Sequence, residues 1–260
     1  MKRMGIYYWF GYPIQNFERF KLIKEAGFDH VMLWWGDEFI EIDGEKAVLP
    51  DMARRLGLAV ENVHLPYEKV NDIWIDGING LDMVKFYKSC ITDCAAHHIP
   101  TAVLHVMDGE TPPAPSQIGI DRFKDIIEFA ERKNVNIALE NLKRPKHLDF
   151  IFSNIQSKCL GFCYDSGHEN CYSQDKDFLS NYGDRLMALH LHDNDGSADQ
   201  HRIPGEGTVN WEMVSEKLFA LEYSGAISLE ITNEFSKQFT GLSPEEFLKV
   251  AYERTYEIFK

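Results

Sequence analysis

The amino-acid sequence predicts a single α/β domain, a (β/α)8 barrel over residues 1–260, with its active site at the carboxyl ends of the strands. Apolar runs of strand length alternate with amphipathic stretches of helix length along the whole chain, giving eight βα units. No linker, low-complexity tract or charge block divides these units. A length of 260 residues with 44% hydrophobic residues suits one large barrel with a sizeable core.

The predicted strands are short and apolar, and most of them end in a polar residue. They cover residues 4–10, 30–35, 58–63, 101–106, 135–140, 160–165, 186–192 and 226–231. An open, doubly wound sheet is the alternative architecture. It is disfavoured because no GxGxxG motif follows the first strand.

The predicted helices follow the strands in turn. They cover residues 17–26, 49–56, 81–97, 118–133, 146–156, 176–182, 211–221 and 244–259. Gly27 and Gly57 close the first two, an acidic loop precedes the second, and Pro100 separates the third helix from the fourth strand. Three prolines in TPPAPS mark a loop before the fourth helix.

The composition narrows the classes of function. The formal net charge of −14 opposes any partner recognised mainly through phosphates, so a nucleic-acid partner is not expected, whereas a small-molecule substrate and a homo-oligomer are compatible with it. No stretch of 18 apolar residues and no signal peptide is present, so we expect a cytoplasmic protein without membrane contact. The five cysteines form no CxxC pair, which favours buried free thiols.

Nearly every predicted strand ends in a residue that can bind a metal or transfer a proton. These residues are His64, His105, Glu140, Asp165, His190 with His192, and Glu230. A barrel would bring them to one face. Carboxylates and imidazoles are costly to bury without partners, so a shared divalent cation is the simplest stabiliser. Taken singly, each has an ordinary alternative, such as a hydrogen-bonded strand-end histidine or a glutamate paired with an arginine.

Two further pairs lie in loops. Asp165 and His168 in DSGH are three residues apart, a spacing that lets a turn aim both at one site. Asp199 and His201 are two residues apart in the long loop after the seventh strand, and a turn there could likewise aim both side chains at one site. The alternative is that this is an ordinary solvated polar loop. Aromatic residues at the ends of the first two strands could stack on an apolar face of a substrate. Lys143 and Arg202 are candidate cations near a phosphate or carboxylate.

With these residues assembled, the chain resembles the xylose isomerase-like TIM barrel superfamily, which holds sugar isomerases and epimerases and zinc-dependent abasic-site endonucleases. The resemblance covers essentially the whole chain. It is carried by HLPY at 64–67, LEN at 139–141, DSGH at 165–168, HLHDND at 190–195, DQHRIPGEGTVNW at 199–211 and LEI at 229–231.

The isomerase and epimerase branch implies one divalent ion, of Mn, Mg, Co or Zn, held by Glu140, Asp165, His190 and Glu230. His168, His192 and Arg202 would then contact substrate. The endonuclease branch implies three zinc ions. In that branch His64 and His105 share Glu140 at the first ion, Asp165, His190 and Glu230 join at the second, and His168, Asp199 and His201 hold the third.

Three functions are therefore compared. The leading one is isomerisation or epimerisation of a small sugar, sugar phosphate or keto-polyol through a metal-stabilised enediolate, with Glu140 and Glu230 transferring the proton. The same bases would serve a dehydratase. The second is phosphodiester hydrolysis at abasic sites, which the net charge disfavours. The third is a barrel without turnover, which the paired glutamates argue against.

Overall fold

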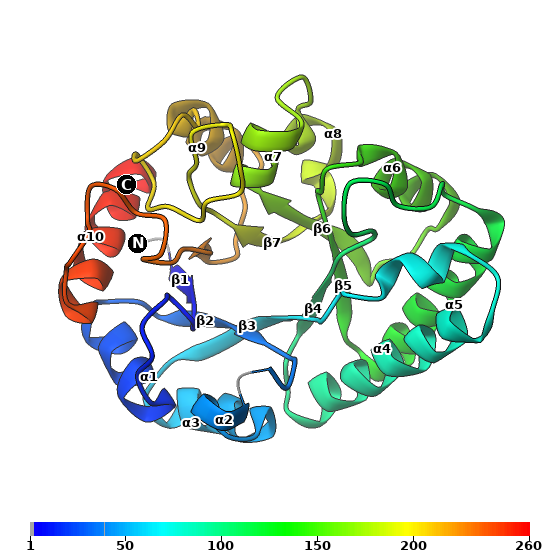
Figure 1. Ribbon diagram of the computed structural model, residues 1–260, viewed down its shortest axis with the longest axis horizontal. Coiled ribbons are helices and arrows are strands. Elements are labelled where there is room, and N and C mark those ends of the chain that lie inside the picture. The colour runs from blue at the N-terminus through cyan, green and yellow to red at the C-terminus, as the bar shows by residue number, and fades with distance from the viewer. Residues whose placement is uncertain (1–2, 39) are drawn as a thin grey trace.

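The computed structural model describes residues 3–38 and 40–260, and within them eight parallel strands are surrounded by helices (Figure 1). The strands are β1 (Met4–Tyr7), β2 (His30–Trp34), β3 (Ala59–His64), β4 (Thr101–Leu104), β5 (Asn136–Glu140), β6 (Leu160–Asp165), β7 (Leu186–His190) and β8 (Ile227–Leu229). They pair in sequence order from β1 to β7, and β8 returns to pair with β1. The predicted (β/α)8 barrel is confirmed.

The barrel closes between β7 and β8 just beyond the named strands. Leu191 and Leu229 form a parallel bridge there. The Leu191 N–H donates to the Ser228 carbonyl at 2.9 Å, and the Glu230 N–H donates to the Leu191 carbonyl at 3.0 Å. The eight strands therefore form a nearly closed ring, and the strand ends converge on one rim.

Helices follow the strands as the alternating pattern predicts, with several short additions. They are α1 (Asn16–Glu25), α2 (Ile40–Asp43), α3 (Leu49–Arg55), α4 (Ile78–Ala96), α5 (Gln117–Lys133), α6 (Pro145–Asn154), α7 (Ser166–Tyr172), α8 (Phe178–Tyr182), α9 (Trp211–Ala220) and α10 (Pro244–Phe259), with 3-10 turns η1 (Lys46–Val48), η2 (Val70–Trp74) and η3 (Gly183–Arg185). None of the helices in the described ranges has the length and apolarity that a membrane crossing needs.

The differences from the predicted elements are local. Strands β1, β4, β7 and β8 stop two to three residues before the predicted ends, because the residues that follow leave the ladder for the rim. Helix α7 was not predicted, and it starts directly after β6 with no intervening loop. The predicted acidic loop after the second strand contains α2 and η1, and its residue 39 lies outside the described residues, as do residues 1 and 2 of the predicted domain.

The strand period of two decides which side chains enter the barrel. Side chains at i and i+2 share a face, so residues two positions before the rim also point inward. On four strands these are small, buried residues that form a separate apolar cluster, namely Val103, Ala138, Cys163 and Ala188. This cluster forms an apolar floor below the rim on the side of β4 to β7. The main core lies between the strands and the surrounding helices.

Candidate metal centre

Each of the eight strands supplies one side chain to the rim above this floor. The residues are Tyr7, Trp34, His64, His105, Glu140, Asp165, His190 and Glu230, which stand at the last position of a strand or directly after it. Six of them were singled out from the sequence as strand-end polar residues. The structure brings those six together, and Tyr7 and Trp34 join them from β1 and β2.

Four of these residues form one group of ligand atoms. One oxygen or nitrogen from each of Glu140, Asp165, His190 and Glu230 lies within 4.8 Å of the others. His190 stands between the two glutamates, since its Nδ1 is 3.5 Å from Glu140 Oε1 and 3.3 Å from Glu230 Oε2. Three carboxylates and one imidazole around a common point have the donor types that a divalent cation takes.

Two more histidines approach the outer oxygen of Glu140. Glu140 Oε2 lies 3.3 Å from His64 Nε2 and 3.4 Å from His105 Nε2. Trp34 stacks on the His64 ring at 5.3 Å, and Tyr67 stacks on the His105 ring at 3.9 Å. Both imidazoles are therefore held in place by aromatic neighbours while their Nε2 atoms face the carboxylate.

The first turn of α7 positions His168. Asp165 is the N-cap of this helix, and its Oδ1 accepts a 2.6 Å hydrogen bond from the His168 N–H. The three-residue spacing therefore returns the imidazole over the same site, with Nδ1 3.1 Å from Glu140 Oε1. Asn141 fixes Asp165 in turn, because its side-chain amide exchanges two 2.8 Å hydrogen bonds with the Asp165 backbone.

Asp199 and His201 reach the same site from the loop after β7. Asp199 Oδ2 lies 3.2 Å from His168 Nε2 and 3.2 Å from His201 Nε2. His201 adopts a left-handed backbone with φ of 44°, a conformation that a non-glycine residue rarely takes and that is often found at functional sites. The two loop pairs singled out from the sequence thus lie side by side.

Three of these histidines have their tautomer set by the backbone. Their Nδ1 atoms lie 2.8 to 3.1 Å from carbonyl oxygens, which can only accept, so each Nδ1 carries the proton; the pairs are His64 with Leu65, His168 with Asn141, and His201 with Glu230. Each Nε2 faces a carboxylate, and its lone pair becomes available to a metal when the imidazole loses its second proton. Metal-ligating histidines are commonly oriented in this way.

Buried polar atoms without a hydrogen bond gather at this rim. Among the described residues they include both Glu140 oxygens, Asp165 Oδ2, both His190 nitrogens and Asp199 Oδ1. Glu140, Asp165 and His190 are at most 1% exposed, so water does not compensate them freely. Such groups are rare in folded proteins, and a cluster of them fits a bound cation. Glu140, Asp165 and His190 therefore have unsatisfied polar atoms, and together with Glu230 they provide the donor set that a divalent ion needs.

The electrostatics of the site are those of tightly paired acids and imidazoles. Burial favours a neutral Glu140, but His190 and His105 hold the pKa of its carboxyl well below the usual range. Burial lowers the pKa of His168 and His201, whereas neighbouring Asp165 and Asp199 raise the pKa of His168 well above its ordinary value, and Asp199 raises that of His201 to about 10. In the metal-free protein, protons on these imidazoles thus balance the carboxylates.

His192 lies within the cluster, whereas Arg202 lies beside it. His192 is fully buried, and its Nε2 lies 3.1 Å from Asp165 Oδ1 and 3.4 Å from Asp199 Oδ1. Its ring stacks on that of His201 at 4.1 Å, and with His201 and Glu230 it forms another group of side chains that could hold a metal ion. Arg202 donates from Nε to the Phe235 carbonyl at 3.1 Å and pairs with Asp195 at 3.2 Å. Neither residue is among those that line the site cavities. Their assignment to substrate contact stays a prediction.

Two adjoining cavities lie over the cluster. The first has a volume of about 260 Å³, and its walls include Tyr7, Trp34, Phe235 and Thr232 around His64, His105, Glu140 and Glu230. The second has about 220 Å³ and extends toward Leu142, Lys143 and Tyr172. They share Tyr67, His105, His168 and Asp199. Together they provide a small, partly aromatic chamber above the metal-competent group.

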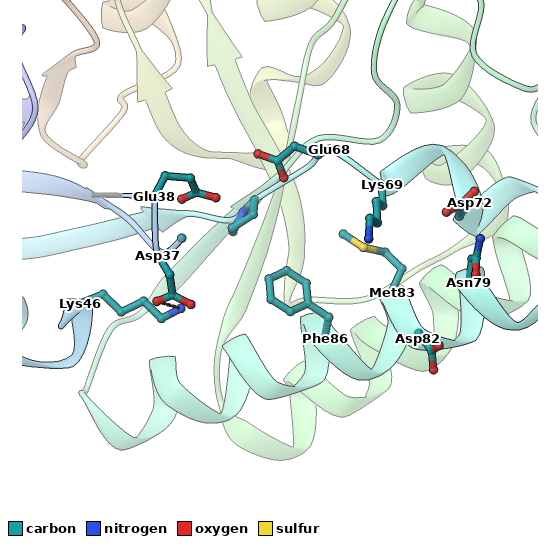
Figure 2. Close-up of a pocket in the computed structure, with 12 residues that line it drawn as sticks. Asp37, Glu38, Lys46, Glu68, Lys69, Asp72, Asn79, Asp82, Met83 and Phe86 are labelled. Atoms are coloured by element: carbon teal, nitrogen blue, oxygen red, sulfur yellow. Dashed lines mark ion pairs between the residues drawn. The ribbon is translucent and has the colours of Figure 1, made fainter. Parts of the chain in front are cut away.

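A larger groove lies outside the barrel. It has a volume of about 740 Å³ between the segment after β2 and helix α4. Figure 2 shows Phe86 and Met83 extending from α4 into it, with Glu38 and Glu68 on the opposite side. No histidine and no strand-end carboxylate lines this groove, and none of the buried unpartnered atoms in the described chain belongs to its lining. The metal-competent side chains therefore line the smaller cavities and not this groove.

Several residues at the site were not identified from the sequence. Tyr67, Thr232, Glu234, Phe235 and Tyr172 all line the cavities. Tyr67 follows His64 by three residues within the HLPY motif, and this proximity is the one sequence signal that could have placed it. The others lie on segments whose path depends on tertiary contacts.

The fold and the rim together define a TIM-barrel protein with a metal-competent cluster at its strand ends. The chain belongs to the xylose isomerase-like TIM barrel family, whose model matches residues 20–248. Two relatives share most of its length. "Uncharacterized protein y4fM" of Sinorhizobium fredii is 27% identical, and the match covers 80% of this chain and 78% of that protein. "Uncharacterized protein MJ1311" of Methanocaldococcus jannaschii is 29% identical, and the match covers 75% of this chain and 72% of that protein.

Solved structures of this superfamily have the same fold. An L-ribulose 3-epimerase superposes with a TM-score of 0.79 at 16% identity, covering 100% of this chain and 95% of its own. A D-psicose 3-epimerase from Clostridium cellulolyticum H10 gives 0.80 at 14% identity, with 100% of both chains covered. The IOLI protein, solved with a bound zinc atom, superposes with a TM-score of 0.77 at 15% identity, and the match covers 100% of this chain and 98% of that protein. These neighbours share the fold of the chain over nearly its whole length.

Proposed function

We propose that the protein is a divalent-metal-dependent isomerase or epimerase of a small sugar, sugar phosphate or related keto-polyol. The observation that carries the proposal is the group of Glu140, Asp165, His190 and Glu230, whose ligand atoms lie within 4.8 Å of one another at the base of a small chamber. The epimerase names of structurally similar proteins support the same reaction class. In this proposal the four residues hold one ion.

When bound, the ion would polarise the carbonyl and neighbouring hydroxyl oxygens of the substrate, which makes the adjacent C–H more acidic. Glu140 and Glu230 are the bases. They stand at the end of β5 and directly after β8, three strands apart, and both lie within 3.5 Å of His190 Nδ1. One glutamate removes the proton from carbon and the other returns it, a general acid–base step. His168, over the same site, holds a substrate hydroxyl.

A second candidate is zinc-dependent phosphodiester hydrolysis of the abasic-site endonuclease type. The observation in its favour is the placement of His64, His168 and His201, whose Nδ1 atoms donate to backbone carbonyls and whose Nε2 atoms face Glu140 and Asp199. With His105, these residues would provide two further ligand sets. Against it stands the net charge of −14.

Metal content is expected to separate the two candidates. The purified protein, loaded with Mn, Co or Zn and freed of excess metal, should hold one tightly bound ion per chain by elemental analysis. It should also leave an abasic-site duplex uncut. Three ions per chain together with cleavage of that duplex would instead establish the hydrolase.

The apparent affinity for the ion is expected to rise with pH. Burial lowers the pKa of His190, but Cys163, Glu230 and Glu140 raise it well above the ordinary value in the metal-free protein. Below that raised pKa the imidazole is protonated, and the proton must leave before nitrogen binds the ion. Affinity should therefore climb by up to about tenfold per pH unit for each proton displaced. Competition with a chromophoric chelator at pH 6, 7 and 8 measures it, and a flat profile would contradict the assignment of His190.

A further inference from the structure

We propose that the groove outside the barrel, between the segment after β2 and helix α4, is a docking site for a basic segment of a partner protein. The partner would place an apolar side chain against Phe86 and its lysine or arginine side chains beside Glu38 and Glu68. This interaction goes beyond the reaction proposed for the strand-end site and does not depend on it. Three observations carry it: one face of α4 borders the groove, exposed apolar side chains extend this face, and the rest of the lining is acidic.

One face of α4 is turned to the groove. The residues of α4 in its lining are Asn79, Asp82, Met83 and Phe86, which stand at positions i, i+3, i+4 and i+7 and therefore share one side of the helix. Phe86 is 37% exposed, and its ring extends into the groove beside Met83 (Figure 2). Covering this ring removes apolar surface from water, so the face offers an anchor point to another chain.

The apolar surface continues past the first turn of α4. Ile75 is 47% exposed and Ile78 is 63% exposed, and both lie on the chain between Asp72 and Asn79, two residues that line the groove. Exposed hydrophobic side chains that are scattered singly are ordinary, whereas those that gather at one place are typical of protein interaction sites. The helix face from Asn79 to Phe86 is about 10 Å long at 1.5 Å per residue. This length suits a peptide segment of several residues.

Negative charge predominates in the rest of the lining. Three of its carboxylates form no ion pair with a lysine or arginine in the described part of the chain, namely Glu38, Glu68 and Asp72. The lining contains two lysines, Lys46 and Lys69, and the first is already paired with Asp37 at 2.9 Å. This excess favours a cationic occupant, and the net charge of −14 attracts such a partner over a longer range. A second copy of this chain carries the same charge and is disfavoured.

The groove and the strand-end chamber share a wall. Pro66 and Glu68 line the groove, whereas Tyr67 between them lines the chamber. Glu38 lines the groove and accepts a hydrogen bond from Trp34 Nε1, and the Trp34 side chain lines the chamber. A cation that pairs with Glu38 would compete with this hydrogen bond. Docking in the groove would therefore change the surroundings of a residue in the chamber wall.

Fluorescence anisotropy of a labelled peptide tests the docking. The probe is an amphipathic peptide of about ten residues built from lysine, leucine and phenylalanine, and its counterpart has glutamate in place of each lysine. We expect the basic peptide to bind the full chain with a dissociation constant of about 100 µM or less at low salt, and the acidic one at least about tenfold more weakly. Absence of binding by the basic peptide, or equal binding of the two, would overturn the proposal.

Two substitutions locate the binding in the groove. Phe86→Ser removes the apolar anchor and Glu68→Lys reverses one charge, and each should weaken binding of the basic peptide by at least about tenfold. The matched controls are Phe17→Ser on α1 and Glu216→Lys on α9, which change exposed residues outside the lining and should bind like the parent protein. If Phe86→Ser and Glu68→Lys also bound like the parent, the peptide would bind elsewhere and the groove would not be its site.

Sedimentation of the protein without peptide distinguishes the occupants. We expect the parent protein and Phe86→Ser to have the same oligomeric state, because the groove is not an interface between copies of this chain. A dimer of the parent that Phe86→Ser and Glu68→Lys both dissociate would show that a second copy fills the groove, and would overturn the assignment to a basic partner.

Discussion

Glu140→Gln is expected to lower kcat/KM by at least about 10³-fold on a confirmed substrate, since general acid–base catalysis alone contributes about 10² to 10⁴. The substitution keeps the shape of the side chain and removes its charge. Glu140 is 1% exposed and lies within 3.5 Å of His64, His105, His168 and His190, so it contributes to every part of the cluster. We also expect the variant to bind the ion at least about tenfold more weakly.

Steady-state kinetics and metal content of the purified variant measure both effects. Glu216→Gln, an exposed carboxyl on α9, is the control and should retain activity and metal. A circular dichroism spectrum like that of the parent protein would show that the barrel is intact. Full activity in Glu140→Gln would mean that the proposed proton transfer is wrong.

Asp193→Ala is expected to destabilise the protein by about 3–5 kcal/mol, because each buried donor that loses its partner costs about 1–3 kcal/mol. Asp193 is 0% exposed. Its carboxylate accepts hydrogen bonds from the Gly205 and Val209 N–H groups at 2.8 and 3.1 Å and from the Trp211 indole at 2.8 Å. Removing the carboxylate leaves these donors buried without a partner.

The same substitution should also disturb the site. The Asp193 carboxylate holds Gly205 and Val209, which lie on the segment that returns from the loop carrying Asp199 and His201. Urea unfolding gives the free energy of unfolding, and the apparent metal affinity reports the site. Asp82→Ala on α4 removes only an exposed pair with Lys85 and should change neither quantity measurably. If Asp193→Ala matched that control, the loop would not depend on this carboxylate.

Local signals in the chain were sufficient for most of the fold. Helix α10 spans the predicted residues because Ser243 and Glu246 form a capping box with proline at the first helical position. Helix α7 was missed because its N-cap, Asp165, is also the last residue of β6. Because the strand end and the helix start share one residue, no loop of typical turn composition separates them in the sequence.

Only some of the site residues could be predicted from the sequence. Strand-end histidines and carboxylates could be identified because polar residues are unexpected after buried runs, and the barrel geometry brings such ends together. Tyr7 and Trp34 hold equivalent positions at the ends of their strands. An aromatic residue is equally common in a core and in a cavity wall, so the sequence does not distinguish the two. The place of Arg202 depends on the antiparallel bridge to Asp193, which sequence spacing does not encode.

The barrel closes at a seam between β7 and β8, and this closure links ion binding to the local stability of the barrel. The ladder there continues through Leu191 and Leu229, with two backbone hydrogen bonds in the described chain, and His190 and Glu230 stand on opposite sides of it. An ion ligated by both would act as a cross-link between the first and last edges of the sheet. Binding free energy would then add to the cost of local opening at this seam, and amide exchange in β7 and β8 would slow relative to the rest of the barrel.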